Sequence, residues 1–188
     1  MGVMIIGLLI FFGTHYFTAL LRGPRAALIS ALGETGYKAL YAVIALAGFV
    51  LIVVGWRGAA DAGVLYTPPA FLRHVSYLLM IFAVVLIVAA YAPAGKIAHA
   101  VKHPMLAAVK IWAFAHLLVN GEARSVVLFG AFLAFAVVDR IAVKRRDAPV
   151  RAAGPATNDA IAVGGGLIAY AAILFYLHPY IAGAALVS

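Results

Sequence analysis

The stretch FLRHVSYLLMIFAVVLIVAAY, residues 71–91, decides the fold class. After its first few residues it contains no charged side chain. A helix of this length reaches about 30 Å, which is the thickness of the hydrocarbon core of a bilayer. The strict alternation of polar and apolar residues that a barrel strand requires is missing from this stretch. The pattern therefore predicts a transmembrane helix.

The rest of the chain has the same apolar character. Of its 188 residues, 66% are hydrophobic and 11% are charged, whereas about a quarter of the residues in an ordinary soluble domain are charged. A domain of this size leaves much of its surface exposed, so the composition excludes a water-soluble globular protein. We predict an all-α, polytopic transmembrane helical bundle with about six spans, a five-helix core plus a C-terminal span. The expected spans are residues 3–21, 38–56, 71–91, 103–120, 124–143 and 159–181.

A polar segment rich in Pro and Gly separates the last expected span from the others. It predicts one transmembrane domain at residues 1–147, a linker at residues 148–158 and an additional C-terminal helix at residues 159–188. The last span contains the run Gly164-Gly165-Gly166. Three glycines in a span either kink the helix or allow another backbone to approach closely.

The net charge of +8 would suggest a nucleic-acid partner in a soluble protein. In this chain most of the 14 Lys and Arg residues lie in the loops after spans one, three and five. The positive-inside rule then predicts a multi-pass membrane protein with these cations in the cytoplasm and both termini outside it, and with the bilayer rather than nucleic acid as its partner. The cytoplasmic cations are Arg22, Arg25, Lys38, Lys96, Lys102, Arg140, Lys144, Arg145, Arg146 and Arg151.

Several kinds of chemistry are excluded by residues that the sequence lacks. With no cysteine, the chain has no disulfide, no thiolate metal site and no cysteine nucleophile. No P-loop, G-x-S-x-G or H-E-x-x-H motif is present. None of the acidic residues lies plainly in mid-membrane, which argues against a small transporter that uses a carboxylate relay. Asp139-Arg140, at the end of the fifth span, predicts a local or interhelical ion pair at the membrane interface.

Two histidines lie deep within expected spans, where an ionisable residue suggests function. His15 lies about 18 Å from the outer end of span one, and His116 lies about 20 Å from the inner end of span four. Both are therefore at similar depth, and facing imidazoles can ligate a haem iron from two helices. Arg22 lies nearly on the face of His15 and could bind a haem propionate. Trp112, one turn before His116, could shape the pocket.

Simpler interpretations of the histidines stay open. A single histidine in a membrane often serves as a hydrogen-bond partner between helices. His74 and His103 are secondary candidates for the site, and an interfacial position explains them equally well. The pair His103-Pro104 is also typical of the start of a helix, because proline suits the first turn.

Four stretches resemble the NnrU family of membrane proteins. Together with the histidine of span one they cover residues 1 to about 147, and as a set in this order they are specific. The stretches are LGETGYKALYAVIALAGFVLIVVGW at 32–56, LYTPPAFLRHV at 65–75, HPMLAAVKIWAFAHLLVNG at 103–121 and LFGAFLAFAVVDRIAVKRR at 128–146.

The resemblance implies a location in the bacterial inner membrane, so that both termini would be periplasmic. It also implies a role in redox or nitrogen-oxide metabolism, since bacterial family members are associated with the expression of nitrite and nitric oxide reductases, and so with denitrification. The 15-cis-ζ-carotene isomerases are similar membrane enzymes that contain haem b. Their WCLAH motif corresponds to WAFAH here, so the resemblance implies haem b at His116, with His15 as the second ligand. Ala113 replaces the cysteine, which argues against isomerase chemistry by histidine–cysteine exchange. The alternative is a non-enzymatic accessory or assembly factor whose partner is a membrane-bound respiratory reductase.

Overall fold

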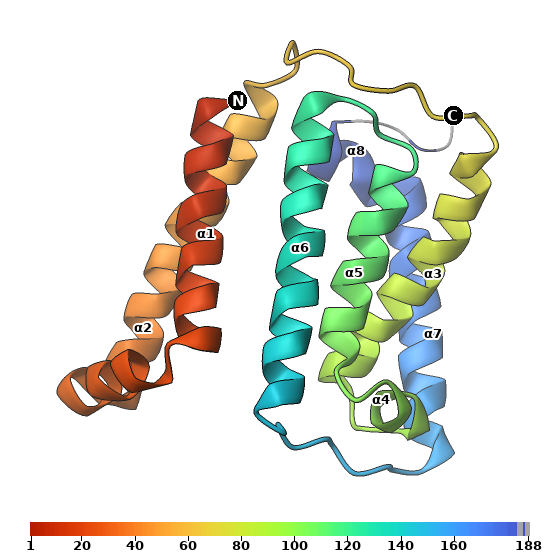
Figure 1. The fold of residues 1–188 in the computed structure, drawn as a ribbon. Helices are drawn as coiled ribbons and strands as arrows, with labels where there is room; N and C mark the ends of the chain where they lie inside the picture. The colour runs from red at the N-terminus through yellow and green to blue at the C-terminus, as the bar shows by residue number, and fades with distance from the viewer. Residues whose placement is uncertain (184–185, 187–188) are drawn as a thin grey trace. The chain divides into compact units, whose positions relative to one another are not determined.

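The computed structural model describes residues 1–183 and 186, and over this part of the chain it contains helices and no β-sheet (Figure 1). The chain divides into two compact units. The first comprises Met1–Thr67 and Asn120–Asp147, and the second comprises Pro68–Val119 and Ala148–Ser188. The helices are α1 (Gly2–Leu20), α2 (Arg22–Arg57), α3 (Leu72–Tyr91), α4 (Lys96–Val101), α5 (Pro104–Leu117), α6 (Ala123–Arg145), α7 (Ala156–Ala172), η1 (Ile173–Leu177) and α8 (His178–Ala182).

Five helices among the described residues are long and apolar enough to cross a membrane. They are α1, α2, α3, α6 and the continuous run Ala156–Ala182. The predicted all-α transmembrane bundle is thereby confirmed. The expected fourth span is shorter than predicted, because α5 has 14 residues and so a length of about 21 Å. It ends at Leu117, three residues before the expected end at residue 120.

In the first unit, α1 and α2 pack with their backbones in contact. Met4, Leu8, Phe12 and Ile52 form the buried cluster between them, and apolar side chains of α6 pack against it. Glycines make the close approach possible: a Cβ atom on Gly48 would lie 2.7 Å from the Phe11 nitrogen. In lipid, helix association depends on packing of this kind, because the surrounding acyl chains are as apolar as the helices.

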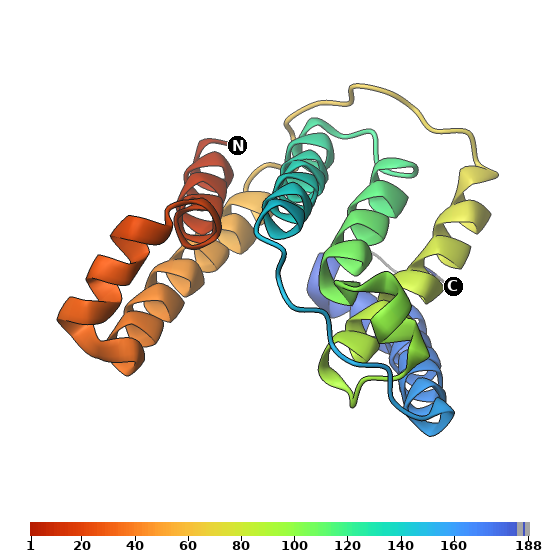
Figure 2. The same cartoon turned by 60° about the horizontal axis from the view of Figure 1, so that its bottom comes forward.

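The helix α2 begins well before the expected span at residues 38–56. The sequence predicted a loop after span one, and this prediction was wrong, because residues 22–32 are helical. Their run of Ala and Leu favours a helix, and Pro24 suits its first turn. Gly33 has φ 72° and ψ 164°, a conformation that interrupts the helix and that a residue without Cβ adopts readily. Figures 1 and 2 show the first part of α2 turned away from the axis of the rest.

In the second unit, α3 packs against α5 and α7. A Cβ atom on Gly166 would lie 2.7 Å from the Val85 Cα, so the backbones of α3 and α7 are in close contact there. Gly166 therefore serves for close approach, whereas a Cβ atom on Gly164 would meet nothing within 4 Å. The three glycines do not kink the helix, since α7 continues through them to Ala172.

Hydrogen bonds fix the segment that the sequence predicted as a linker. The guanidinium of Arg151 donates to the carbonyl oxygens of Ala89, Ala90 and Ala92, at the end of α3. The carboxylate of Asp159 accepts hydrogen bonds of 2.9–3.0 Å from the first two backbone nitrogens of α4. Helix ends leave such groups without partners inside the helix, so these two side chains attach the segment to α3 and α4.

We expect Asp159→Ala to lower the free energy of unfolding by about 1 kcal/mol, as for the loss of other helix caps. The fraction of folded protein measured against the mole fraction of SDS in mixed micelles would report this change. Asp61→Ala is the matched control, because Asp61 is exposed and lies in the loop after α2. Equal shifts for the two variants would contradict the capping role.

Candidate functional site

A cavity of about 340 Å³ lies in the first unit, where α1 ends, α2 begins and α6 ends. We call it the arginine cavity. Charged, polar and aromatic side chains line it. They are His15, Thr18, Ala19, Arg22, Arg25, Tyr41, Phe135, Asp139 and Arg146.

Short-range contacts bring the three helices together at this cavity. Arg146, just after α6, donates from Nη1 to the Ala19 carbonyl oxygen at 3.3 Å, so the ends of α6 and α1 meet. The hydroxyls of Thr18 and Tyr37 share a hydrogen bond of 2.8 Å between α1 and α2. Because α2 starts two residues after α1 ends, Arg22 is carried directly to the cavity.

His15 is held in one orientation. Its Nδ1 donates to the Phe11 carbonyl oxygen at 2.7 Å, since a carbonyl oxygen only accepts. In the neutral ring, Nε2 then carries the lone pair that a metal or a donor could use. The ring centroid lies 4.2 Å from that of Phe11, 5.4 Å from that of Tyr41 and 5.5 Å from that of Phe135. The imidazole is therefore part of an aromatic wall.

The charges of the cavity are unequal. Three guanidinium groups and one carboxylate line it, which leaves two positive charges. The carboxylate belongs to Asp139, whose Oδ1 is buried with no hydrogen-bond partner among the described residues. The cavity therefore offers cations for an anionic ligand, and one unused acceptor.

The prediction that Asp139-Arg140 takes part in a local or interhelical ion pair was wrong. Over the part of the chain that the structure describes, the ion pairs join Glu34 to Lys38 and Glu122 to Arg124. Neighbouring residues of a helix point about 100° apart and do not face each other. Asp139 faces the cavity instead.

The structure brings together His15 and Arg22, which sequence reasoning had placed on one face. It adds Tyr41, Asp139 and Arg146, whose part in the site that reasoning missed. A signal for α6 was present, because Phe135, Asp139 and Arg146 are spaced by four and seven residues and so share a helix face.

His116 has a local environment like that of His15, but in the second unit. Its Nδ1 donates to the Trp112 carbonyl oxygen at 2.8 Å, and the two ring centroids are 5.2 Å apart. Trp112 thus lies beside His116, and its part in shaping a cofactor pocket stays a prediction. Since the two histidines belong to different units, their facing each other stays a prediction.

The secondary candidates lie at helix starts. His74 is exposed in the first turn of α3. His103 precedes α5, with Pro104 in the first turn. The prediction that His103-Pro104 starts a helix is confirmed, and a ligand role for either histidine stays a prediction.

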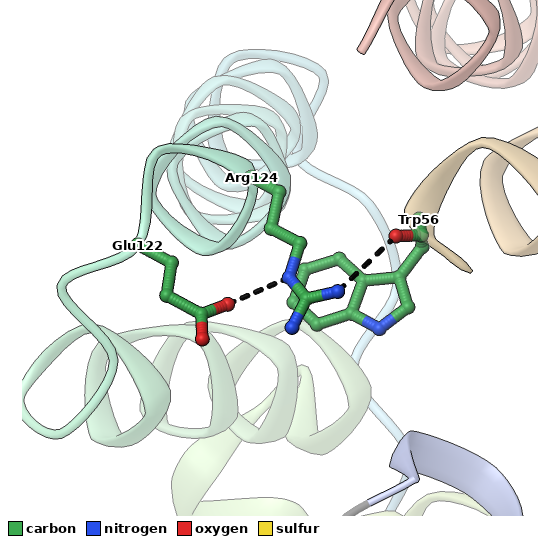
Figure 3. Close-up of polar contacts among 3 residues, drawn as sticks. All are labelled: Trp56, Glu122 and Arg124. Carbon is green, nitrogen blue, oxygen red and sulfur yellow. Dashed lines mark hydrogen bonds and ion pairs between the residues drawn. The ribbon is translucent and has the colours of Figure 1, made fainter. Parts of the chain in front are cut away.

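The other end of the first unit carries a second polar group, around Arg124 (Figure 3). The guanidinium lies 4.6 Å from the centroid of the Trp56 ring and donates at 3.4 Å to the Trp56 carbonyl oxygen. Its Nε donates to Glu122 Oε2 at 2.6 Å. These contacts hold the end of α2 to the start of α6. Because the chain itself satisfies the guanidinium, we assign this group a structural role.

Comparison with known proteins gives the family. A family model described as NnrU protein matches residues 3–186. The chain belongs to the NnrU family. The match extends beyond residue 147 and includes α7 and α8, so family resemblance is not confined to the quoted stretches. The division of this NnrU protein at residue 147 into a domain and a separate helix stays a prediction. Searches of curated proteins and of solved structures found no match.

Proposed function

We propose that this NnrU family membrane protein binds haem b, and that His15 would bind the iron and Arg22 the propionates. One observation carries the proposal: a single cavity is lined by three arginines and by a histidine whose Nδ1 is hydrogen-bonded, so that its Nε2 lone pair can bind a metal. An imidazole nitrogen is the usual protein ligand of a b-type haem, and arginine binds carboxylates through paired hydrogen bonds.

The residues of the cavity fit this group in three respects. The backbone carbonyl that accepts from His15 Nδ1 sets the tautomer that a metal ligand requires. The rings of Phe11, Tyr41 and Phe135 supply an apolar, aromatic wall beside it. The two excess positive charges of the cavity would balance the two negative charges of the propionates.

We propose His116 as a second residue that would bind the iron, on the basis of the sequence and of its matching Nδ1 hydrogen bond. A bound haem supplies one-electron redox chemistry. The chain's own residues would orient the imidazoles, neutralise the carboxylates and keep water from the apolar wall. Such a protein suits the redox or nitrogen-oxide metabolism that the family resemblance implies.

Absorption spectra of the detergent-purified protein, oxidised and reduced, test the proposal together with a pyridine haemochrome assay. We expect a b-type spectrum with about one haem per chain. Arg22→Ala should weaken haem retention about tenfold or more, as loss of a charge-assisted hydrogen bond does, with unchanged band positions.

Arg57→Ala is the matched control, because Arg57 is an exposed arginine at the other end of α2. Equal retention in both variants would remove Arg22 from the site. Wild-type protein without haem, even after growth with added haem, would overturn the proposal and favour the accessory or assembly factor.

A further inference from the structure

The helix α2 is longer than a membrane span. Its 36 residues would reach about 54 Å as one straight helix, against a hydrocarbon core of about 30 Å. The break at Gly33 divides it, and residues 34–57 alone reach about 36 Å, which suffices to cross. The preceding residues, 22–32, which we call the entry segment, are therefore not needed for the span.

The entry segment packs against little of the first unit. Its residues are exposed or half-buried, and Leu32 is 47% exposed. A helix of this length, about 16 Å, is marginal in water without a surface to pack on. Apart from Arg22 and Arg25, which line the arginine cavity, most of the segment is left exposed by the first unit, and Figures 1 and 2 show the segment turned away from the rest of α2.

One face of the segment carries a stripe of apolar side chains. Pro24, Leu28 and Leu32 follow one another at four-residue spacing, so they form this stripe. Arg25 borders the stripe, where a long side chain can extend to the headgroups while its stem stays among apolar groups, and Ser30 lies on the opposite side of the helix. An apolar stripe on an otherwise unpartnered helix is typical of helices that lie along a membrane surface.

The charges near the segment indicate which lipids it meets. The entry segment contains arginines and no acidic residue. The bond from Arg146 to the Ala19 carbonyl brings the end of α6 to the same end of the unit. Lys144 and Arg145 are exposed there. Basic residues beside a membrane surface attract anionic headgroups.

We propose that the entry segment lies in the plane of the membrane surface, with Leu28 and Leu32 in the boundary between headgroups and acyl chains of an anionic leaflet. The helix axis turns at Gly33 from this plane into the span. This placement does not depend on haem binding, since it rests on the length, exposure and charge of α2 and α6.

Site-directed spin labelling tests the proposal directly, because the natural chain contains no cysteine. Single cysteines at residues 26–32 of the full chain would be labelled in nanodiscs of phosphatidylglycerol and phosphatidylcholine. Collision rates with oxygen and with a nickel chelate give the depth of each label. We expect a depth that oscillates with the helical period, with positions 28 and 32 deepest, about 5–10 Å below the headgroups.

Labels at Leu40, Val43 and Ile44 are the control, since these exposed residues lie in the spanning part of α2. Their depth should change steadily, by about 1.5 Å per residue. The same steady change through residues 26–32, towards water, would overturn the proposal by showing an upright extension. The Lys144→Gln, Arg145→Gln double variant should reduce the depth at position 28 in anionic discs only. Equal depths in anionic and neutral discs would overturn the assignment to an anionic leaflet.

Discussion

Replacing Gly55 with valine should disrupt the packing of α1 against α2. A Cβ atom at this position would collide with the backbone of Met4, and backbone cannot rotate away as a flexible side chain can. Overpacking of a close contact costs about 1–3 kcal/mol, occasionally more. We expect a loss of about 3 kcal/mol because two helix axes must separate. The unfolding transition in mixed SDS micelles measures this loss.

Gly13→Val is the matched control, because it makes the same substitution on α1, where a new Cβ would meet nothing within 4 Å. Both variants change helix propensity alike, so the difference between them isolates the collision. If Gly13→Val destabilised the protein as much as Gly55→Val, the close approach would not be the cause.

His15→Ala should abolish haem binding or replace its spectrum by that of a weakly held haem. The substitution removes the imidazole that lines the arginine cavity and leaves the arginines in place. The Soret band and the haemochrome yield measure the loss. Added free imidazole should restore part of the bound haem, which a purely structural role of His15 would not predict.

His99→Ala serves as the control, since His99 is exposed, lies in the second unit and is not a candidate for the site. His116→Ala should leave haem bound through His15 but change its ligation, so that the sharp bands of a six-coordinate iron are lost. Unchanged spectra in His116→Ala would exclude it as the second ligand. Unchanged spectra in His15→Ala would contradict the assignment of the arginine cavity.

Hydropathy was sufficient to predict the fold class, because apolar runs such as residues 71–91 have few alternatives in a chain this poor in charge. It did not predict the entry segment. Arg22 and Arg25 suggested a loop. Charged residues indicate that a segment lies near water, but they do not determine its backbone conformation. The break at Gly33 depends on a single φ angle, and the sequence around it reads equally well as a turn or a continuous helix.

The candidate site was predictable only within single helices and their immediate neighbours. His15 and Arg22 are seven residues apart, so helical periodicity relates them. Asp139 comes from α6, and only the packing of α6 against α1 brings it to the cavity. The sequence suggested a local partner in Arg140, because adjacency in sequence is visible and the facing of distant helices is not.

The two units interleave along the chain, and this arrangement affects the order in which they can form during synthesis. The first unit includes residues up to Asp147, so it is complete only after α6 has been synthesised, well after α1 and α2. The second unit contains α3 and α5 but also α7, whose Gly166 packs on Val85. Until the ribosome has made α7, the surface of α3 around Val85 has no partner helix. Each unit therefore passes through an incomplete stage in the bilayer. During that stage, lipids or insertion factors must cover the helix surfaces that the later helix will bury.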